Sequence, residues 1–586
     1  MRSITVIKWI GAFTLLNCGL LLGLTQCSSL EPSENAVSTS AASTSNRYGS
    51  YLAGRFAASE RDSSAAASYF DKALKFDPQN PALLERALLS EVAGGDIDSA
   101  ADYAEDLVKH APKARLPYIV IGVRAMREGG YAKAHDSFEK VAGNAAAEIA
   151  SKLGMAYARF AEGNLDQAKA ALTKVTTLGG TQAFGLYHKA VIEDLAGKSA
   201  EALIDFEEAN RLSEGQSLRI MHAYASELAR QGQTEKAKEI YQTYLKTTPG
   251  NPFIRNALTS LNAGKATPRV ISSAKQGLAE TFYGIAASLT DEDAVEIPVF
   301  YLQLALALDP HHDLSLSLLA DRMETAERWN DAIDIYERVE PTSVLYPNAR
   351  LQIAQSLQKL KRPNDAISTL MKSLTGTADD VELHAAIGDV LRGEEKYAEA
   401  VESYNKAIQL ISQPEIRHWT LFYTRGISNE RSKRWQAAEA DFKQSLKLKP
   451  EQPMVMNYLA YSWVEQNINI PEALAMLKRA VDLRPEDGFI VDSLGWAHFR
   501  LGDFQTAVKY LEQAVLLEPG QATINDHLGD AYWRLGRKLE AKFQWQHALA
   551  MGAEPADEPK IRQKLDAGLQ DLPRAPAHAG SPQGGK

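Results

Sequence analysis

Residues 488–553 contain two consecutive copies of one 34-residue pattern, and this repeat constrains the fold more than any other feature of the chain. In the first copy Leu494-Gly495 precedes Gly502, and in the second Leu528-Gly529 precedes Gly536. Small or apolar residues then follow at spacings of four and three: Ala507, Leu511 and Ala514, and Ala541, Trp545 and Ala548. Such spacings place side chains on one stripe of a helix. Each copy therefore predicts two packed helices joined by a turn at a glycine, where a positive φ is favourable.

Helix–turn–helix units at a 34-residue period resemble the tetratricopeptide repeat (TPR). One pair of helices cannot bury its apolar face alone, so the pairs must stack on each other. Weaker copies extend back to residue 47, and we expect an all-α TPR superhelical solenoid of about 13–14 repeats. The register breaks over 251–276, which predicts an irregular hinge between an N-terminal block, 47–250, and a C-terminal block, 277–553.

The two ends of the chain differ from the repeats. Arg2 and Lys8 precede an apolar run that ends at Thr25, so residues 1–27 read as a secretory signal, with an uncleaved membrane anchor as the alternative. Leu24-Thr25-Gln26-Cys27 resembles the lipobox of bacterial lipoproteins, which implies acylation of Cys27, although Gln26 stands where that motif has Gly or Ala. Residues 28–46 predict a flexible Ser/Ala-rich tether, 554–572 a capping helix and 573–586 a disordered tail.

The sequence offers little for catalysis or for nucleic-acid binding. The net charge is −10 and no dense basic run occurs, which argues against a nucleic-acid partner. We find no motif of a hydrolase, metalloprotease or dinucleotide-binding enzyme, and we expect no enzyme activity, cofactor or metal. Gly197-Lys198-Ser199 imitates the end of a phosphate-binding loop but falls in a predicted turn, and His311-His312 lacks further ligands nearby.

A TPR superhelix offers a concave groove formed by the first helix of each repeat. By resemblance to the family, certain first-helix offsets face this groove, and in the last three repeats they predict a peptide site. Its residues are Asn457, Tyr461, Asp492, Trp496, Phe499, Arg500, Asp526, Asp530, Trp533 and Arg534. Arginine can hold a carboxylate through two hydrogen bonds, and tryptophan supplies contact area. The alternative is a structural network in which Arg500 and Arg534 pair with Asp492, Asp526 or Asp530.

The C-terminal repeats, with Leu494-Gly495-Trp496 and Tyr532-Trp533-Arg534, resemble a group of long, exported bacterial TPR lipoproteins. This group includes the lipoprotein binding partner of a periplasmic carboxy-terminal processing protease. The resemblance implies an adaptor on the periplasmic side of the outer membrane that delivers cell-wall hydrolases to the protease. The alternative is an assembly factor for surface polysaccharide or outer-membrane components. The sequence is also compatible with a homo-oligomer, because a long solenoid exposes edges that can dimerise.

Overall fold

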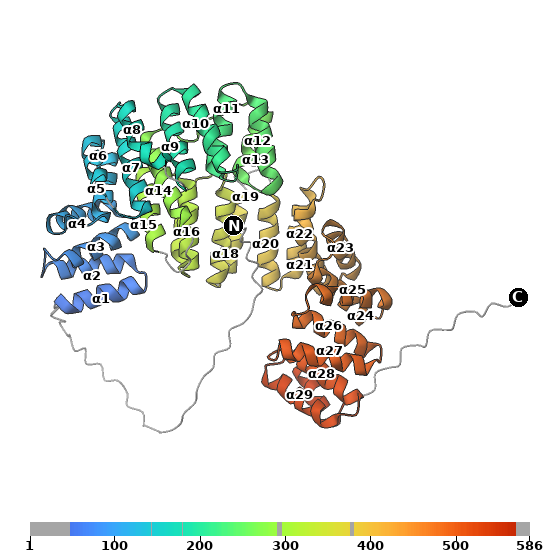
Figure 1. Cartoon of the computed structure of the whole chain (residues 1–586). Coiled ribbons are helices and arrows are strands. Elements are labelled where there is room, and N and C mark those ends of the chain that lie inside the picture. The colour runs from blue at the N-terminus through green and yellow to red at the C-terminus, as the bar shows by residue number, and fades with distance from the viewer. Residues whose placement is uncertain are drawn as a thin grey trace.

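A computed structural model describes residues 47–141, 143–177, 180–265, 267–289, 296–374 and 380–569. Over these residues the chain has thirty α-helices, one short 3-10 helix and no strand. The helices stack in sequential pairs, which confirms the all-α solenoid expected from the sequence (Figure 1). No helix in the described ranges is both long and apolar enough to cross a membrane. The predicted signal, Cys27, the tether and the C-terminal tail lie outside these ranges.

Twelve helices form six pairs in the N-terminal block. Their bounds are α1 Arg47–Ser59, α2 Ser63–Leu74, α3 Pro81–Gly94, α4 Ile97–His110, α5 Leu116–Glu128, α6 Tyr131–Glu139, α7 Ala145–Ala161, α8 Leu165–Thr177, α9 Gln182–Leu195, α10 Ser199–Leu212, α11 Leu218–Arg230 and α12 Thr234–Thr247. A single helix, α13 Pro252–Asn262, packs on the last of them.

The later helices continue the pairwise pattern to the C-terminal end. Their bounds are α14 Ala274–Ser288, α15 Glu296–Leu308, α16 Asp313–Thr325, α17 Trp329–Glu337, α18 Tyr346–Lys359, α19 Pro363–Leu374, α20 Val381–Gly393, α21 Tyr397–Gln409, η1 Ile416–His418, α22 Trp419–Arg431, α23 Trp435–Leu448, α24 Pro453–Glu465, α25 Ile470–Leu483, α26 Gly488–Arg500, α27 Phe504–Leu517, α28 Ala522–Arg534, α29 Lys538–Ala550 and α30 Glu558–Ala567. Helix α30 lies within the predicted capping segment.

The glycines of the repeat pattern have two roles, one at the predicted turns and one at the contact between paired helices. Gly502 and Gly536 turn the chain between paired helices with φ values of 83° and 80°, in the left-handed region that glycine enters without strain. Gly495 lies at the contact between α26 and α27, where an added Cβ would come within 2.8 Å of Leu511 Cγ. The absence of a side chain therefore lets the two helices approach closely.

Helices α14 and α15 do not simply extend the stack. They return inside the arch formed by the N-terminal block, where α14 packs on α7 and α9 and α15 packs on α3 and α5 (Figure 1). Glu280 of α14 is 2% exposed and accepts hydrogen bonds from Arg219 Nε at 2.8 Å and Nη2 at 2.7 Å. A second partner, His312, places Nε2 3.1 Å from the same carboxylate. The first pair of the predicted C-terminal block thus lies in the interior of the N-terminal one.

The segment predicted as a hinge, 251–276, contains α13 and a loop attached to the N-terminal block. Arg269 Nε donates to Asp194 Oδ1 at 3.1 Å, and Ser226 Oγ donates to the carbonyl of Pro268 at 2.9 Å. Ile271 is only 5% exposed. Helix α14 begins at Ala274, ahead of the predicted boundary at 277. Hinge motion in this segment stays a prediction.

Candidate partner-binding surface of the C-terminal repeats

The residues predicted to form the groove lie on α24, α26 and α28, the first helices of the last three pairs. We call this set the first-helix face. Its half-buried members are Asn457, Tyr461, Trp496, Arg500, Asp526, Trp533 and Arg534. Burial raises the pKa of Tyr461, so its hydroxyl stays neutral. On the same side, Met454 is 50% exposed and Phe489 is 40% exposed at the start of α24 and α26. The face therefore combines apolar area with charged and aromatic groups.

Arg500 and Trp496 of α26 both contact Glu465 at the end of α24. Arg500 Nη1 donates to Glu465 Oε1 at 2.7 Å, and Trp496 Nε1 donates to the same oxygen at 2.6 Å. The side chains of Arg500 and Glu465 remain 26% and 41% exposed. This ion pair links two neighbouring repeats at the surface, where solvent weakens it.

A second link joins α26 to α28. His527 Nδ1 lies 2.9 Å from Asp492 Oδ1 and 3.0 Å from Oδ2, and both residues are less than 10% exposed. Burial opposes the charged imidazole, but the carboxylate of Asp492, together with those of Asp526 and Asp530, outweighs burial and raises the pKa of His527. The His527 ring also stacks on Trp496, with centroids 4.0 Å apart. The tryptophan is thereby held in a fixed orientation.

The capping helix α30 supplies the third link. Lys564 Nζ donates to Asp526 Oδ2 and to Asp530 Oδ2, each at 2.8 Å. Asp530 also accepts from Trp545 Nε1 at 2.9 Å. Burial is the main reason that the pKa of Asp530 is raised to about 6, against the opposing charge of Lys564. Helix α30 thus covers part of the first-helix face of the last repeat.

These contacts correct two details of the predicted site. Phe499 is 2% exposed and packs in the core, because it lies between Trp496 and Phe504 with ring centroids 4.7 Å and 5.4 Å away. It therefore does not face a groove. Arg500 pairs with Glu465 rather than with an aspartate of the set. Asp492 is instead paired with His527, while Asp526 and Asp530 are paired with Lys564.

Sequence reasoning missed Glu465, His527 and Lys564. Glu465 was detectable, because it occupies in α24 the same offset as Arg500 in α26. His527 lies one residue away from a groove offset, and Lys564 comes from outside the regular repeats. Neither carried a signal that pointed to its aspartate partner.

Two other candidate sites have ordinary structural explanations. Gly197 has a φ of 75° in the turn between α9 and α10, as predicted. His311 and His312 contact different partners, because His312 bonds to Ser315 and Glu280 while His311 Nδ1 lies 3.2 Å from Glu340. Within the described residues, one group could bring three ligand atoms together, formed by His135, Asp136 and Glu139 on α6. Arg159 Nη2 lies 3.2 Å from His135 Nδ1, which places a cation where a metal ion would bind.

Comparison with known proteins supports the repeat assignment. Models of the tetratricopeptide repeat family match residues 381–414 and 493–557. A TPR repeat-containing protein of Pseudomonas aeruginosa is 26% identical over 197 residues, which cover 33% of this chain and 32% of the relative. Tetratricopeptide repeat protein 13 of Homo sapiens is 25% identical over 245 residues, which cover 42% of this chain and 25% of the relative. The chain therefore matches about a third or less of the length of these relatives.

Among solved structures, the APC/C hetero-tetramer Cut9-Hcn1 aligns over 89% of this chain and 96% of its own, with 14% identity and a TM-score of 0.37. The yeast Tom70 structure aligns over 89% of this chain and 95% of its own, with 13% identity and a TM-score of 0.31. The family assignment rests on the matched repeats and on the paired helices of the fold. The chain therefore contains tetratricopeptide repeats, which match the family models over residues 381–414 and 493–557, and the paired helices of the fold continue the same architecture.

Proposed function

We propose that this protein is a non-enzymatic adaptor of the bacterial cell envelope that binds partner proteins on the first-helix face of its C-terminal repeats. One observation supports the choice of surface. In the N-terminal block, α14 and α15 cover the inner side of α3, α5, α7 and α9, whereas in the C-terminal repeats Met454 and Phe489 are 50% and 40% exposed at the starts of α24 and α26, on the side of the first-helix face. Exposed apolar area on the same side as a tryptophan in a fixed orientation and an arginine is the kind of surface that anchors a partner segment.

The more specific form of the proposal rests on the resemblance of the C-terminal repeats and on the N-terminal residues. An apolar run followed by Cys27 supports export and a lipid anchor, with the protein on the periplasmic side of the outer membrane. The partners would then be a carboxy-terminal processing protease and the cell-wall hydrolases delivered to it. The anchor is tested with Cys27→Ser, which should abolish incorporation of labelled palmitate and move the protein from the membrane fraction to the soluble fraction. Unchanged fractionation and labelling would remove the anchor from the proposal.

The partner is tested by capture of tagged protein from crosslinked envelopes, read by mass spectrometry. Arg500→Ala/Arg534→Ala should deplete the captured partners while the thermal transition is retained. Arg479→Ala is the matched control, because Arg479 forms an exposed ion pair with Glu451 away from the first-helix face. A protease and wall hydrolases in the wild-type sample support the adaptor role. Enrichment of polysaccharide-assembly or barrel-assembly proteins would favour the assembly factor, and equal capture by the double variant would reject this surface.

A further inference from the structure

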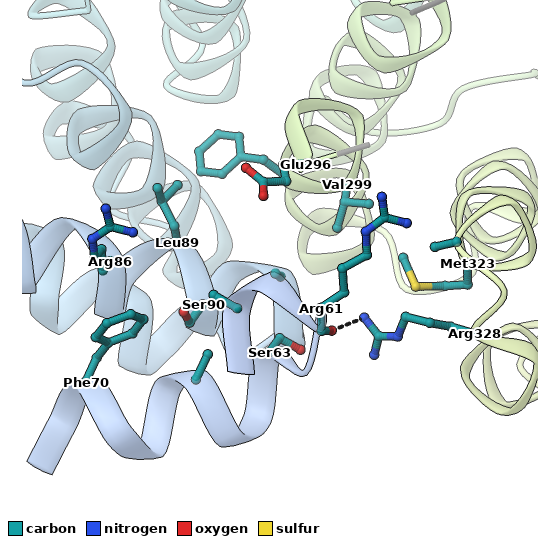
Figure 2. Close-up of a pocket in the computed structure, with 15 residues that line it drawn as sticks. Arg61, Ser63, Phe70, Arg86, Leu89, Ser90, Glu296, Val299, Met323 and Arg328 are labelled. Carbon is teal, nitrogen blue, oxygen red and sulfur yellow. Dashed lines mark hydrogen bonds between the residues drawn. The ribbon is translucent and has the colours of Figure 1, made fainter. Parts of the chain in front are cut away.

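Helices α14 and α15, which line the inner side of the N-terminal block, leave a pocket beside the first two repeats in the described part of the chain. Helix α15 begins at Glu296, beside α3, and an open pocket lies between α1–α3 on one side and α15–α16 on the other (Figure 2). Its volume is about 190 Å³. A buried apolar cavity of ~150 Å³ already accommodates a benzene ring, so this pocket has room for one large apolar side chain.

The walls of the pocket are mainly apolar and come from both layers. Phe70 and Leu89 line the side of the first two repeats, while Val299, Phe300 and Met323 line the opposite side. Four of these side chains are at most 7% exposed, but Leu89 is 37% exposed, although it is large and apolar. An exposed leucine that faces a pocket gains free energy when a ligand's apolar group covers it.

Three arginines surround this apolar space: Arg61, Arg86 and Arg328. Arg328 is already paired, with Nε 2.7 Å from Asp331 Oδ2, and it also donates to the backbone carbonyl of Arg61. In the described part of the chain, no carboxylate pairs with the guanidinium of Arg61 or Arg86; Arg86 lies only over the ring of Tyr51, at 5.9 Å. Among the described residues that line the pocket, Glu296 is the one acidic residue. Even in this chain of net charge −10, these described lining residues therefore carry an excess of positive charge.

We infer that this pocket binds a peptide segment of a partner protein in which a bulky apolar side chain stands next to a carboxylate. The apolar side chain enters between Phe70, Leu89 and Met323. The carboxylate meets the guanidinium group of Arg61, a pairing that arginine forms through two parallel hydrogen bonds. Arg86 lies at the other end of the pocket, beside Phe70 and Leu89, and adds positive charge there (Figure 2). The site lies in the opposite block from the first-helix face, so it stands independently of the function proposed above.

The turn that carries Arg61 offers a conservative test. Arg61 has a φ of 59°, and the corresponding turn residue of the next repeat is Gly95, with a φ of 86°. Arg61→Gly therefore removes the guanidinium while suiting the backbone, and it keeps the carbonyl that Arg328 contacts. Lys433 occupies the same turn position in a distant repeat, with a φ of 60°, so Lys433→Gly is the matched control.

The ligand class is tested with a phage-displayed random heptapeptide library, selected on the wild-type protein and counter-selected on Arg61→Gly/Arg86→Gln. The enriched peptides should carry Asp or Glu beside Phe, Leu, Met or Trp. By fluorescence anisotropy, the double variant should bind such a peptide at least about tenfold more weakly, as expected when charge-assisted hydrogen bonds are lost. Replacing the peptide's Asp by Asn should have a similar effect, and Lys433→Gly should leave the affinity unchanged.

Two further variants separate the apolar part from the charged part. Ala58→Trp places a large ring in the pocket and should abolish binding while the arginines remain. Glu296→Gln removes the opposing carboxylate and should tighten binding of the peptide. This variant tests the charged part of the site even if Ala58→Trp fails to fold. A library that yields no arginine-dependent peptides, or yields basic ones, overturns the inference. Peptides that bind Ala58→Trp as well as the wild-type protein overturn it too.

Discussion

The two blocks are built from the same repeat, yet their first helices face different surroundings. In the N-terminal block, α14 and α15 cover the first helices, and the charge of Glu280 is buried with Arg219 and His312. In the C-terminal repeats, the corresponding contacts run sideways from one first helix to the next, as in the exposed pair of Arg500 and Glu465. The repeat pattern therefore determines how the helices stack. The position of α14 and α15 determines which first helices remain exposed to a partner.

Removing Glu280 should give the largest effect. Although burial opposes its charge, Arg219 and His312 hold the pKa of Glu280 well below its usual range, so the carboxylate is ionised. Glu280→Ala leaves the Arg219 guanidinium buried without its partner, which costs about 3–5 kcal/mol of unfolding free energy. Urea denaturation measures the loss, and hydrogen exchange should show α14 as the most affected helix.

The matched control for Glu280 is Glu201→Ala. Glu201 pairs with Lys169 at the surface, where its side chain is 51% exposed and solvent screens the pair, so its removal should have far less effect on stability than removal of Glu280. Equal effects of the two substitutions would mean that α14 is not held by its buried ion pair.

A methyl group at Gly277 should have the next largest effect. Gly277 of α14 lies against the ring of Tyr157, and a Cβ would collide with it. Tyr157 is fully buried, and its hydroxyl lies 2.7 Å from Nδ1 of His188, so the ring has little freedom to move. Overpacking of this kind costs ~1–3 kcal/mol, which Gly277→Ala should show in denaturation experiments.

Gly393 provides the control in the C-terminal repeats. It ends α20, and an added Cβ there meets nothing within 4 Å. Gly393→Ala should therefore be neutral or slightly stabilising, by up to ~1 kcal/mol, because alanine is the better helix former. If both substitutions are neutral, the tight contact between α14 and α7 does not exist in solution.

Acidification should affect the two blocks in opposite directions. Burial lowers the pKa of His188 from 6.5 to about 3. Between pH 6.5 and 5.5, His188 of the unfolded chain therefore becomes protonated, whereas His188 of the native state stays neutral. Over this pH interval the N-terminal block is weakened by about 1 kcal/mol. Burial opposes the charge of His527, but Asp492, Asp526 and Asp530 together raise its pKa, so the stability that it contributes is fully present below pH 6.5 and is lost as the pH rises through the native pKa.

Hydrogen exchange of α9 and α28 at pH 5.5 and 7.5, corrected for intrinsic rates, tests this contrast. Protection of α9 should fall at the lower pH, while protection of α28 should rise. His188→Gln should flatten the response of α9 alone. A parallel change in both helices would show that the two histidines do not control the local stability.

The helical pairs could be predicted from the sequence, but the contacts between the two blocks could not. Gly495 and Leu511 are close in the chain and follow the repeat, so their contact was predictable. Glu280 and Arg219 are 61 residues apart, and nothing in the repeat pattern shows that α14 turns back into the N-terminal block. A break in the repeat register indicates that the regular stacking of helices is interrupted. It does not indicate which helices the following segment packs against.

The candidate site shows the same limit at shorter range. Family offsets placed Trp496 and Arg500 on the first-helix face, whereas Phe499 at the same kind of offset is buried. An offset describes an ideal repeat, and the stacking of Phe499 between Trp496 and Phe504 depends on aromatic residues particular to this repeat. Lys564 reaches Asp530 only because α30 takes the place of a further first helix.

The smallest expected effect concerns Arg500 and decides between its two interpretations. Because Arg500 and Glu465 are 26% and 41% exposed, a double-mutant cycle with Arg500→Ala and Glu465→Ala should give a coupling below about 1 kcal/mol. Thermal denaturation measures this coupling, and Arg479→Ala serves as the control for loss of an exposed arginine. A small coupling combined with a loss of partner capture identifies Arg500 as a binding residue. A coupling above ~2 kcal/mol, with capture unchanged, would show instead that the pair holds α24 and α26 in register.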